Sequence, residues 1–319
     1  MHDLVVVGEI ASDGSLTKLS AEVATLARSL GKASGLKLEG IVPGPSPDKA
    51  ASELAEYIDT VHADHGFDAD SALSAQVAAM LAAYSPTYVL LPASPDGRDV
   101  AGALSALTGM GVLANATGVR WDGGPVATHS VFGGKLITEA AFTDGEGIIT
   151  VRPNSVTAEK LKAPGKAGTM SGGPVPELPT VPIVERLPAE SKAASIDDAR
   201  IIVAGGRGVG GPDGFGLIEE LAKALGGAVG ATRAAVDSGW IPYSQQIGQT
   251  GKIVKPQLYL AMGISGAIQH KVGMQTASTI VAVNRDPDAP IADFADMIVI
   301  GDLVEVGNAI LAELRARKS

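Results

Sequence analysis

The sequence contains no cysteine among its 319 residues. This absence excludes disulfides, thiolate metal sites, iron–sulfur clusters and cysteine nucleophiles. Aromatic residues make up only 4% of the chain, whereas hydrophobic residues make up 45%. The core must therefore be built mainly from Ala, Val, Leu and Ile. Basic residues number 25 against 35 acidic ones, a net charge of −10, which argues against a nucleic-acid or anionic-membrane binder because both need a basic surface.

Histidine is also scarce. The five histidines are His2, His62, His65, His129 and His270. They show no HExxH or other zinc spacing, so we expect no metal site. His62 and His65 lie among charged residues and are interpreted as a solvated helix end. The N-terminus lacks the pattern of a signal peptide, and no window holds 18 uninterrupted apolar residues. We expect no membrane insertion and a cytoplasmic or matrix-like location.

In the first half, short β-branched runs alternate with alanine-rich stretches. The predicted strands are 4–9, 38–42 and 88–94, and the predicted helices are 18–32, 46–58, 71–84 and 99–110. This alternation indicates βαβ units and a parallel sheet. Residues 118–152 change the pattern, because several strand-like runs are joined by Gly-containing turns. We expect them to be antiparallel additions to the same domain.

A domain boundary is indicated at 163–188, where 26 positions hold six prolines and four glycines. We therefore divide the chain into domains at 1–190 and 191–319. In the second domain, strands are predicted at 200–206, 228–233, 258–264, 279–285 and 297–302, and helices at 214–227 and 303–318. The predicted fold class is α/β, with two domains that each contain a mostly parallel open sheet and flanking helices. The second sheet is Rossmann-like, with about five strands.

Polar residues stand at or just after the end of each predicted strand of the second domain. These residues are Arg207, then Thr232 and Arg233, then the stretch GISGAIQH at 263–270, then Asn284, and last Asp302. A long polar loop at 239–254 adds Gln249 and Thr250. Ligands of open α/β sheets bind outside the carboxyl ends of the strands. Glycines, hydroxyls and arginines can cradle a phosphate, so this edge suits a dinucleotide.

Two short motifs in the second domain suggest other chemistry. Residues 206–211, GRGVGG, match GxGxxG, but a Rossmann NAD site needs an acid after the next strand. Thr232 and Arg233 stand there instead, which disfavours NAD and leaves NADP open. GISGA nearly matches the GxSxG elbow of serine hydrolases. The only later histidine is His270, with no acid between it and the serine, so the hydrolase interpretation is weak.

Simple structural roles compete with a binding role at each position. Gly263 and Gly266 can serve a tight turn, and a histidine at a helix start is more often structural. Asn284 and Asp302 are common caps, and Asp302 in particular can N-cap the last helix. The arginines can be surface charges. Five polar strand ends along one edge, taken together, favour a site.

Several long stretches resemble the alpha subunit of electron transfer flavoproteins. The strongest is PQLYLAMGISGAIQHKVGMQTASTIVAVNRDPDAPIADFADMIVIGD at 256–302. VAGGRGVG at 203–210, GATRAAVDSGWIP at 230–242 and QIGQTGKIVKP at 246–256 resemble the same family in the same order. The strong similarity covers about 200–319, and weaker similarity in domain order extends over the first half.

The resemblance implies non-covalent FAD in the C-terminal domain. It implies a heterodimer with a beta subunit that carries AMP, or a second FAD in bifurcating members. It also implies a carrier role in fatty acid oxidation, in which electrons pass from acyl-CoA and related dehydrogenases to a quinone-linked oxidoreductase. The N-terminal domain is expected to be the docking base for the beta subunit.

The resemblance also implies roles for individual residues. Arg207 and Thr232 would meet the pyrophosphate, and family members more often have serine at 232. Arg233 would lie against the isoalloxazine, whose polar edge would contact Gln249 and Thr250. The residues wrapping the flavin and its ribityl chain would be Ser265, Gly266, Ala267, Gln269 and His270, with His270 as a donor or cation at the pyrimidine O2. Asn284 and Asp302 would hold the adenosine end.

Two alternatives to the carrier hypothesis remain open. One is a stand-alone flavin- or NADP-dependent oxidoreductase, which would need a pocket for an organic substrate. We see no acid–base constellation for one and name no catalytic residue. The other is a module that senses an adenine nucleotide at the same edge. Bound flavin separates the first two hypotheses from the third, and dependence on a protein partner separates the carrier from the enzyme.

Overall fold

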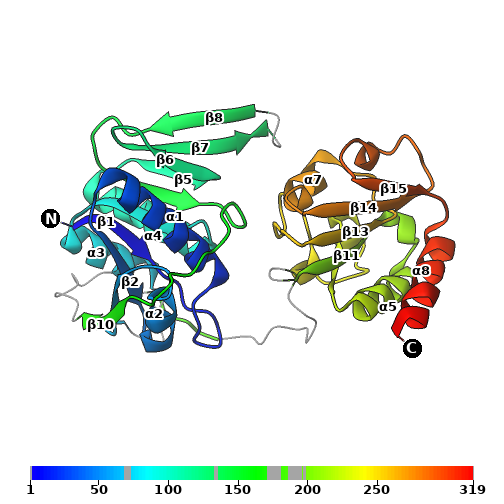
Figure 1. Ribbon diagram of the computed structural model, residues 1–319, viewed down its shortest axis with the longest axis horizontal. Helices are drawn as coiled ribbons and strands as arrows, with labels where there is room; N and C mark the ends of the chain where they lie inside the picture. The colour runs from blue at the N-terminus through cyan, green and yellow to red at the C-terminus, as the bar shows by residue number, and fades with distance from the viewer. Residues whose placement is uncertain are drawn as a thin grey trace. The chain divides into compact units, whose positions relative to one another are not determined.

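The computed structural model describes residues 2–67, 73–132, 136–170, 181–185, 196 and 199–318. The chain divides into two compact units, Met1–Leu187 and Pro188–Ser319 (Figure 1). Each unit has its own parallel sheet covered by helices, which confirms the α/β fold class predicted from the sequence. Among the described residues, no helix is long and apolar enough to cross a membrane.

The first unit is built on a seven-stranded sheet. Its strands are β1 (His2–Val7), β2 (Leu38–Pro43), β3 (Thr60–Asp64), β4 (Pro86–Pro92), β5 (Val112–Ala116), β9 (Gly147–Val151) and β10 (Lys166–Met170). They run in the order β10-β3-β2-β1-β4-β9-β5, and neighbouring strands are parallel. The helices are α1 (Lys18–Ser34), α2 (Asp48–Leu54), α3 (Ser74–Tyr84) and α4 (Pro95–Thr108). A separate antiparallel sheet contains β6 (Gly118–Trp121), β7 (Pro125–Val131) and β8 (Leu136–Ala141).

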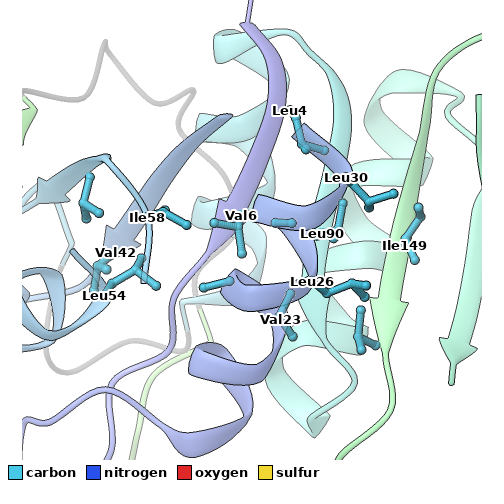
Figure 2. Close-up of a cluster of buried hydrophobic side chains, with 14 of the residues drawn as sticks. Leu4, Val6, Val23, Leu26, Leu30, Val42, Leu54, Ile58, Leu90 and Ile149 are labelled. Atoms are coloured by element: carbon cyan, nitrogen blue, oxygen red, sulfur yellow. The ribbon is translucent and has the colours of Figure 1, made fainter. Parts of the chain in front are cut away.

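Apolar side chains on both faces of β1 explain its central place in the sheet. Leu4 and Val6 belong to one buried cluster with residues of α1 and α2, and Val5 and Val7 belong to another with residues of α3 and α4. Figure 2 shows the first cluster. Successive side chains of a strand point to opposite faces, so an uninterrupted apolar run is what a strand covered on both faces requires.

The main departures from the sequence prediction concern short strands. β3 and β5 were not predicted, and β10 lies inside the segment interpreted as a boundary. Residues 147–151, expected as an antiparallel addition, form the parallel strand β9 in the main sheet. The helix-end interpretation of His62 and His65 is wrong, because His62 lies on β3 and His65 follows it. Much of 163–188, and 71–72 of the predicted helix 71–84, fall outside the described residues.

The carboxylate of Glu9, just after β1, lies at the start of α4. Ser94 donates its hydroxyl hydrogen to Glu9, and the Gly97 backbone N–H contributes a further hydrogen bond. Burial raises the pKa of Glu9 from 4.5 to about 7, against the opposing effect of these hydrogen bonds. The folded chain therefore holds a proton here that the unfolded chain releases between these two pH values. The resulting stabilisation is fully present below pH 4.5 and is lost as the pH rises through about 7.

We expect Glu9→Gln to remove this pH dependence. At 1.36 kcal/mol for each pKa unit, the wild-type free energy of unfolding of the first unit should fall by at most about 3 kcal/mol from pH 4.5 to 8. In the variant, the free energy of unfolding should not show this fall with pH. Urea unfolding followed by Trp121 fluorescence, in a Trp240→Phe background, measures it. Equal slopes in the variant and the parent would contradict the assignment.

The second unit is built on a five-stranded parallel sheet. Its strands are β11 (Ile201–Gly205), β12 (Ala228–Ala231), β13 (Leu258–Met262), β14 (Thr279–Asn284) and β15 (Met297–Ile300). Their order is β12-β11-β13-β14-β15. The helices are α5 (Phe215–Leu225), α6 (Arg233–Asp237), α7 (Ile268–Met274) and α8 (Leu303–Lys318). One buried cluster joins the sheet to α5 and α8, and another joins its opposite face to Met274 of α7. The carboxyl ends of all five strands therefore lie along one edge.

Candidate functional site

A cavity of about 560 Å³ lies at the carboxyl edge of the second sheet. This volume lies within the range of small-molecule and cofactor sites. Ten of the twelve predicted binding residues line it: Arg207, Thr232, Arg233, Gln249, Thr250, Ser265, Ala267, Gln269, His270 and Asn284. They come from the exits of β11, β12, β13 and β14 and from the loop before β13. These residues lie together because the carboxyl ends of the parallel strands share one edge of the sheet, and this edge is where ligands of open α/β sheets bind.

Glycines let the loops that form the cavity pack backbone against backbone. A Cβ at Gly208 would lie 2.7 Å from the Gly263 Cα, and the Gly208 N–H donates to the Gly263 carbonyl at 3.0 Å. Gly266 has a φ of 87°, and a Cβ there would lie 2.4 Å from the backbone nitrogen of Ile291. The sequence offered a tight turn as a structural role for Gly263 and Gly266, and the structure uses both for loop-to-loop packing. Gly263 also lines the cavity, whereas Gly266, expected to help wrap the flavin, is not among the lining residues.

Thr232 places an unsatisfied hydroxyl at the cavity. Its backbone N–H donates to the Gly205 carbonyl at 3.1 Å. Its buried Oγ1 has no hydrogen-bond partner within the described part of the chain. Buried polar groups are almost always paired, because leaving one unpaired costs about 1–3 kcal/mol. A ligand with a hydrogen-bonding oxygen, such as a phosphate, would supply the missing partner.

Charged side chains of both signs line the cavity. Arg207 is exposed, and Arg233 forms an ion pair with Asp237 at 3.1 Å, one helical turn later. Asp237 and Asp286 also line the cavity, and neither was predicted. The spacing of Arg233 and Asp237 on a helix was the available signal, since residues four apart share a face. The arginines supply the positive charge that a diphosphate or a reduced cofactor would need.

The turn carrying Gln249 and Thr250 is tied to its surroundings. The Gln249 backbone N–H donates to the Gln269 carbonyl at 2.7 Å. The Thr250 hydroxyl accepts a hydrogen bond from Gln246 Nε2 at 3.1 Å, and the Thr250 carbonyl accepts one from the Tyr243 hydroxyl at 2.6 Å. The first contact joins the turn to the start of α7, and the other two join it to earlier residues of its own loop. The Thr250 hydroxyl, already an acceptor, keeps its own hydrogen to donate to a ligand.

His270 does not supply the expected cation. The ring is buried, its Nε2 lies 2.9 Å from the Tyr259 hydroxyl, and its Nδ1 lies 3.0 Å from the Ile247 carbonyl. Burial lowers the pKa of His270 to about 4, although the Ile247 hydrogen bond acts in the opposite direction. The ring is therefore neutral near pH 7. The same contacts disfavour a serine hydrolase, because both ring nitrogens are hydrogen-bonded to groups other than Ser265.

Two family models match this chain. Residues 195–275 match the electron transfer flavoprotein FAD-binding domain, and residues 4–179 match the electron transfer flavoprotein domain. The electron transfer flavoprotein subunit alpha of Mycobacterium leprae is 42% identical over 312 residues, with 96% of each chain covered. The chain belongs to the alpha-subunit family of electron transfer flavoproteins.

Other relatives agree with this membership. The electron transfer flavoprotein subunit alpha of Bacillus subtilis is 35% identical over 330 residues, covering 98% of this chain and 97% of the relative. Protein FixB of Bradyrhizobium diazoefficiens is 38% identical over 240 residues, covering 73% of this chain and 65% of the relative. The similarity therefore spans both units, whereas the motifs noted in the sequence were strongest in the second.

In this member of the electron transfer flavoprotein alpha-subunit family, Asp302 caps a helix and forms an ion pair. Its Oδ1 accepts hydrogen bonds from the backbone N–H groups of Val304, at 2.7 Å, and Glu305, at 3.1 Å, and so caps α8. Its Oδ2 forms an ion pair with Arg285. Asp302 does not line the cavity. Asn284 does, and its Nδ2 donates to the Ile264 carbonyl at 3.0 Å, which ties the GIS turn to the end of β14.

Proposed function

We propose that this chain is the FAD-binding alpha subunit of a heterodimeric electron transfer flavoprotein. It takes electrons from acyl-CoA-type dehydrogenases and passes them to a quinone-linked oxidoreductase. The observation that carries the proposal is the convergence of ten predicted cofactor residues on one cavity that contains an unpaired buried hydroxyl. FAD supplies reversible electron acceptance, so the protein needs no acid–base machinery for a substrate of its own.

Different lining residues would bind different parts of the FAD. Arg207 and Thr232 would hold the pyrophosphate, where Thr232 gains its missing partner. Arg233 would face the isoalloxazine and offset the negative charge that reduction brings. Thr250 would donate its hydroxyl hydrogen to the ring's polar edge. Asn284 would bind toward the adenosine end without Asp302, whose carboxylate caps α8.

A partner subunit follows from the same proposal. The chain is to be co-expressed with a beta subunit and purified as a complex, which an acyl-CoA dehydrogenase and its substrate then reduce. We expect bound FAD to be bleached only when the dehydrogenase, its substrate and the beta subunit are all present. Direct oxidation of an organic substrate by this chain alone would favour the stand-alone enzyme. A folded complex without flavin would favour the nucleotide-sensing module.

Thr232→Val tests the fit of the cofactor without disturbing the fold. Valine has the shape of threonine but no hydroxyl, and the Thr232 hydroxyl has no partner to lose among the residues that the structure describes. Without FAD, the variant should be as stable as the wild type or about 1 kcal/mol more stable. Its dissociation constant for FAD should rise about tenfold, equivalent to about 1.4 kcal/mol. Thermal unfolding and fluorescence titration with FAD measure the two effects.

Thr25→Val is the matched control for this experiment. Thr25 is buried in the first unit, where its hydroxyl donates to the Ala21 carbonyl at 2.9 Å and accepts from the Glu159 backbone N–H at 3.0 Å. This variant should lose stability and keep the wild-type affinity for FAD. If Thr232→Val instead lost stability with unchanged affinity, the hydroxyl would have a structural role and the assignment would fail.

A further inference from the structure

A buried tyrosine lies behind the histidine at the wall of the cavity. Tyr259 belongs to β13 and is fully buried, whereas His270 belongs to α7 and is 6% exposed. The tyrosine hydroxyl lies 2.9 Å from His270 Nε2, and the ring centroids are 6.1 Å apart. His270 lines the cavity and Tyr259 does not. The tyrosine can therefore act on a ligand only through the histidine.

The hydrogen bonds determine which ring nitrogen carries the proton. The Ile247 carbonyl can only accept, so Nδ1, at 3.0 Å, must be the protonated nitrogen. In a neutral ring, Nε2 is then an acceptor and receives its hydrogen bond from the Tyr259 hydroxyl. The two contacts together select one tautomer and one ring orientation.

The same pair opposes protonation of the ring. An imidazolium would have to donate from Nε2, so the Tyr259 hydroxyl hydrogen would need another acceptor. The surroundings are apolar and include Ile247, Ile264 and Met274. Other titratable groups near the site are Arg207, Arg233, Asp237 and Asp286 on the cavity wall and the adjacent Lys271, which lies 4.6 Å from the centre of the Phe294 ring. Within the described residues, the ring nitrogens hydrogen-bond to Tyr259 and Ile247 and to none of these five groups.

We propose that Tyr259 is a positioning residue that keeps His270 neutral, in the Nδ1–H tautomer, as a fixed wall of the cofactor cavity. The effect of Tyr259 on the flavin rests on the function proposed above. With the histidine neutral, the positive charge around the cofactor comes from the guanidinium groups of Arg207 and Arg233. The electrostatic environment of the cofactor is then insensitive to pH near neutrality.

Tyr259→Phe removes the hydroxyl and keeps the ring. The neutral histidine loses the hydrogen bond that favours it over the cation, so its pKa should rise. The experiment uses the full chain in complex with its beta subunit, labelled with ¹⁵N-histidine, and follows the His270 ring nitrogens by NMR as the pH changes. His270→Asn assigns the signal among the five histidines.

In the wild type we expect an Nδ1–H ring that does not titrate above pH 5. In Tyr259→Phe we expect mixed tautomers and a titration midpoint at least one pH unit higher. The flavin potential, measured against pH, should gain a matching inflection only in this variant. Tyr243→Phe removes another tyrosine hydroxyl near the cavity, one bonded to the Thr250 carbonyl, and should leave the His270 signals unchanged.

Two results would overturn the inference. One is a wild-type ring protonated on Nε2 or titrating near pH 6.5. The other is a folded Tyr259→Phe variant whose tautomer and midpoint equal those of the wild type. The NMR measurement needs no flavin, so it remains decisive if the protein fails to bind FAD. Failure of the proposed function and failure of this inference are therefore distinguishable, and a melting curve establishes that the variant is folded.

Discussion

Gly266→Ala is expected to destabilise the second unit by about 3 kcal/mol and to abolish retention of the cofactor. The φ of Gly266 is 87°, which costs an alanine about 1–2 kcal/mol. The added methyl would also lie 2.4 Å from the Ile291 nitrogen, an overlap that backbone cannot relieve without moving. Overpacking of this kind typically costs a further 1–3 kcal/mol. Thermal unfolding and the flavin content of the purified protein measure both effects.

Gly226→Ala separates the two causes. Gly226 ends α5 with a φ of 69°, and a Cβ there would have nothing within 4 Å. This control should show the backbone cost alone and keep its flavin. If the two variants had the same stability and the same flavin content, the cavity would not depend on the packing of the 263–267 turn against Ile291.

Arg233→Gln is expected to lower the reduction potential of the bound flavin by about 59 mV for a one-electron couple, a tenfold change in the equilibrium constant. Arg233 lines the cavity and offsets negative charge gained on reduction. Its side chain is 66% exposed, so solvent screening favours the weak end of the Coulomb range, about 1 kcal/mol. Potentiometric titration with reference dyes measures the change.

The control for this charge is Arg315→Gln. Arg315 is an exposed arginine of α8, paired with Glu220 at 3.2 Å and absent from the cavity lining. Its removal changes the net charge by the same amount and should leave the potential unchanged. Equal shifts in both variants would mean that net charge, and not a cation at the cavity, sets the potential.

Long apolar runs made the second sheet predictable. Stretches such as 258–264 and 279–285 have the continuous hydrophobicity of strands buried on both faces, and the polar residues that follow them must meet at one edge. This reasoning found ten lining residues. It missed β5 and β10, which are the two edge strands of the first sheet, and it missed β3, the neighbour of β10, where His62 interrupts the apolar pattern. Edge strands carry little of the apolar pattern on which such predictions depend.

The roles of single residues were harder to predict than their place. Gly263 and Gly266 were correctly interpreted as special, but the backbone that fills the space beside each comes from Gly208 and Ile291, distant in sequence. His270 was expected to be a donor or cation at the cofactor, but its ring bonds to Tyr259, which is 11 positions earlier and on another element. Such pairings depend on how loops pack across the sheet. They have no local signature in the sequence.

The central claim, that the cavity of the second unit is a FAD site, is tested most directly by a binding titration. The chain, purified with its beta subunit and stripped of flavin, is titrated with FAD while flavin fluorescence is followed. The account predicts saturable binding of one FAD per alpha chain, weakened about tenfold by Thr232→Val. A folded protein that binds an adenine nucleotide at this cavity but not FAD would contradict it.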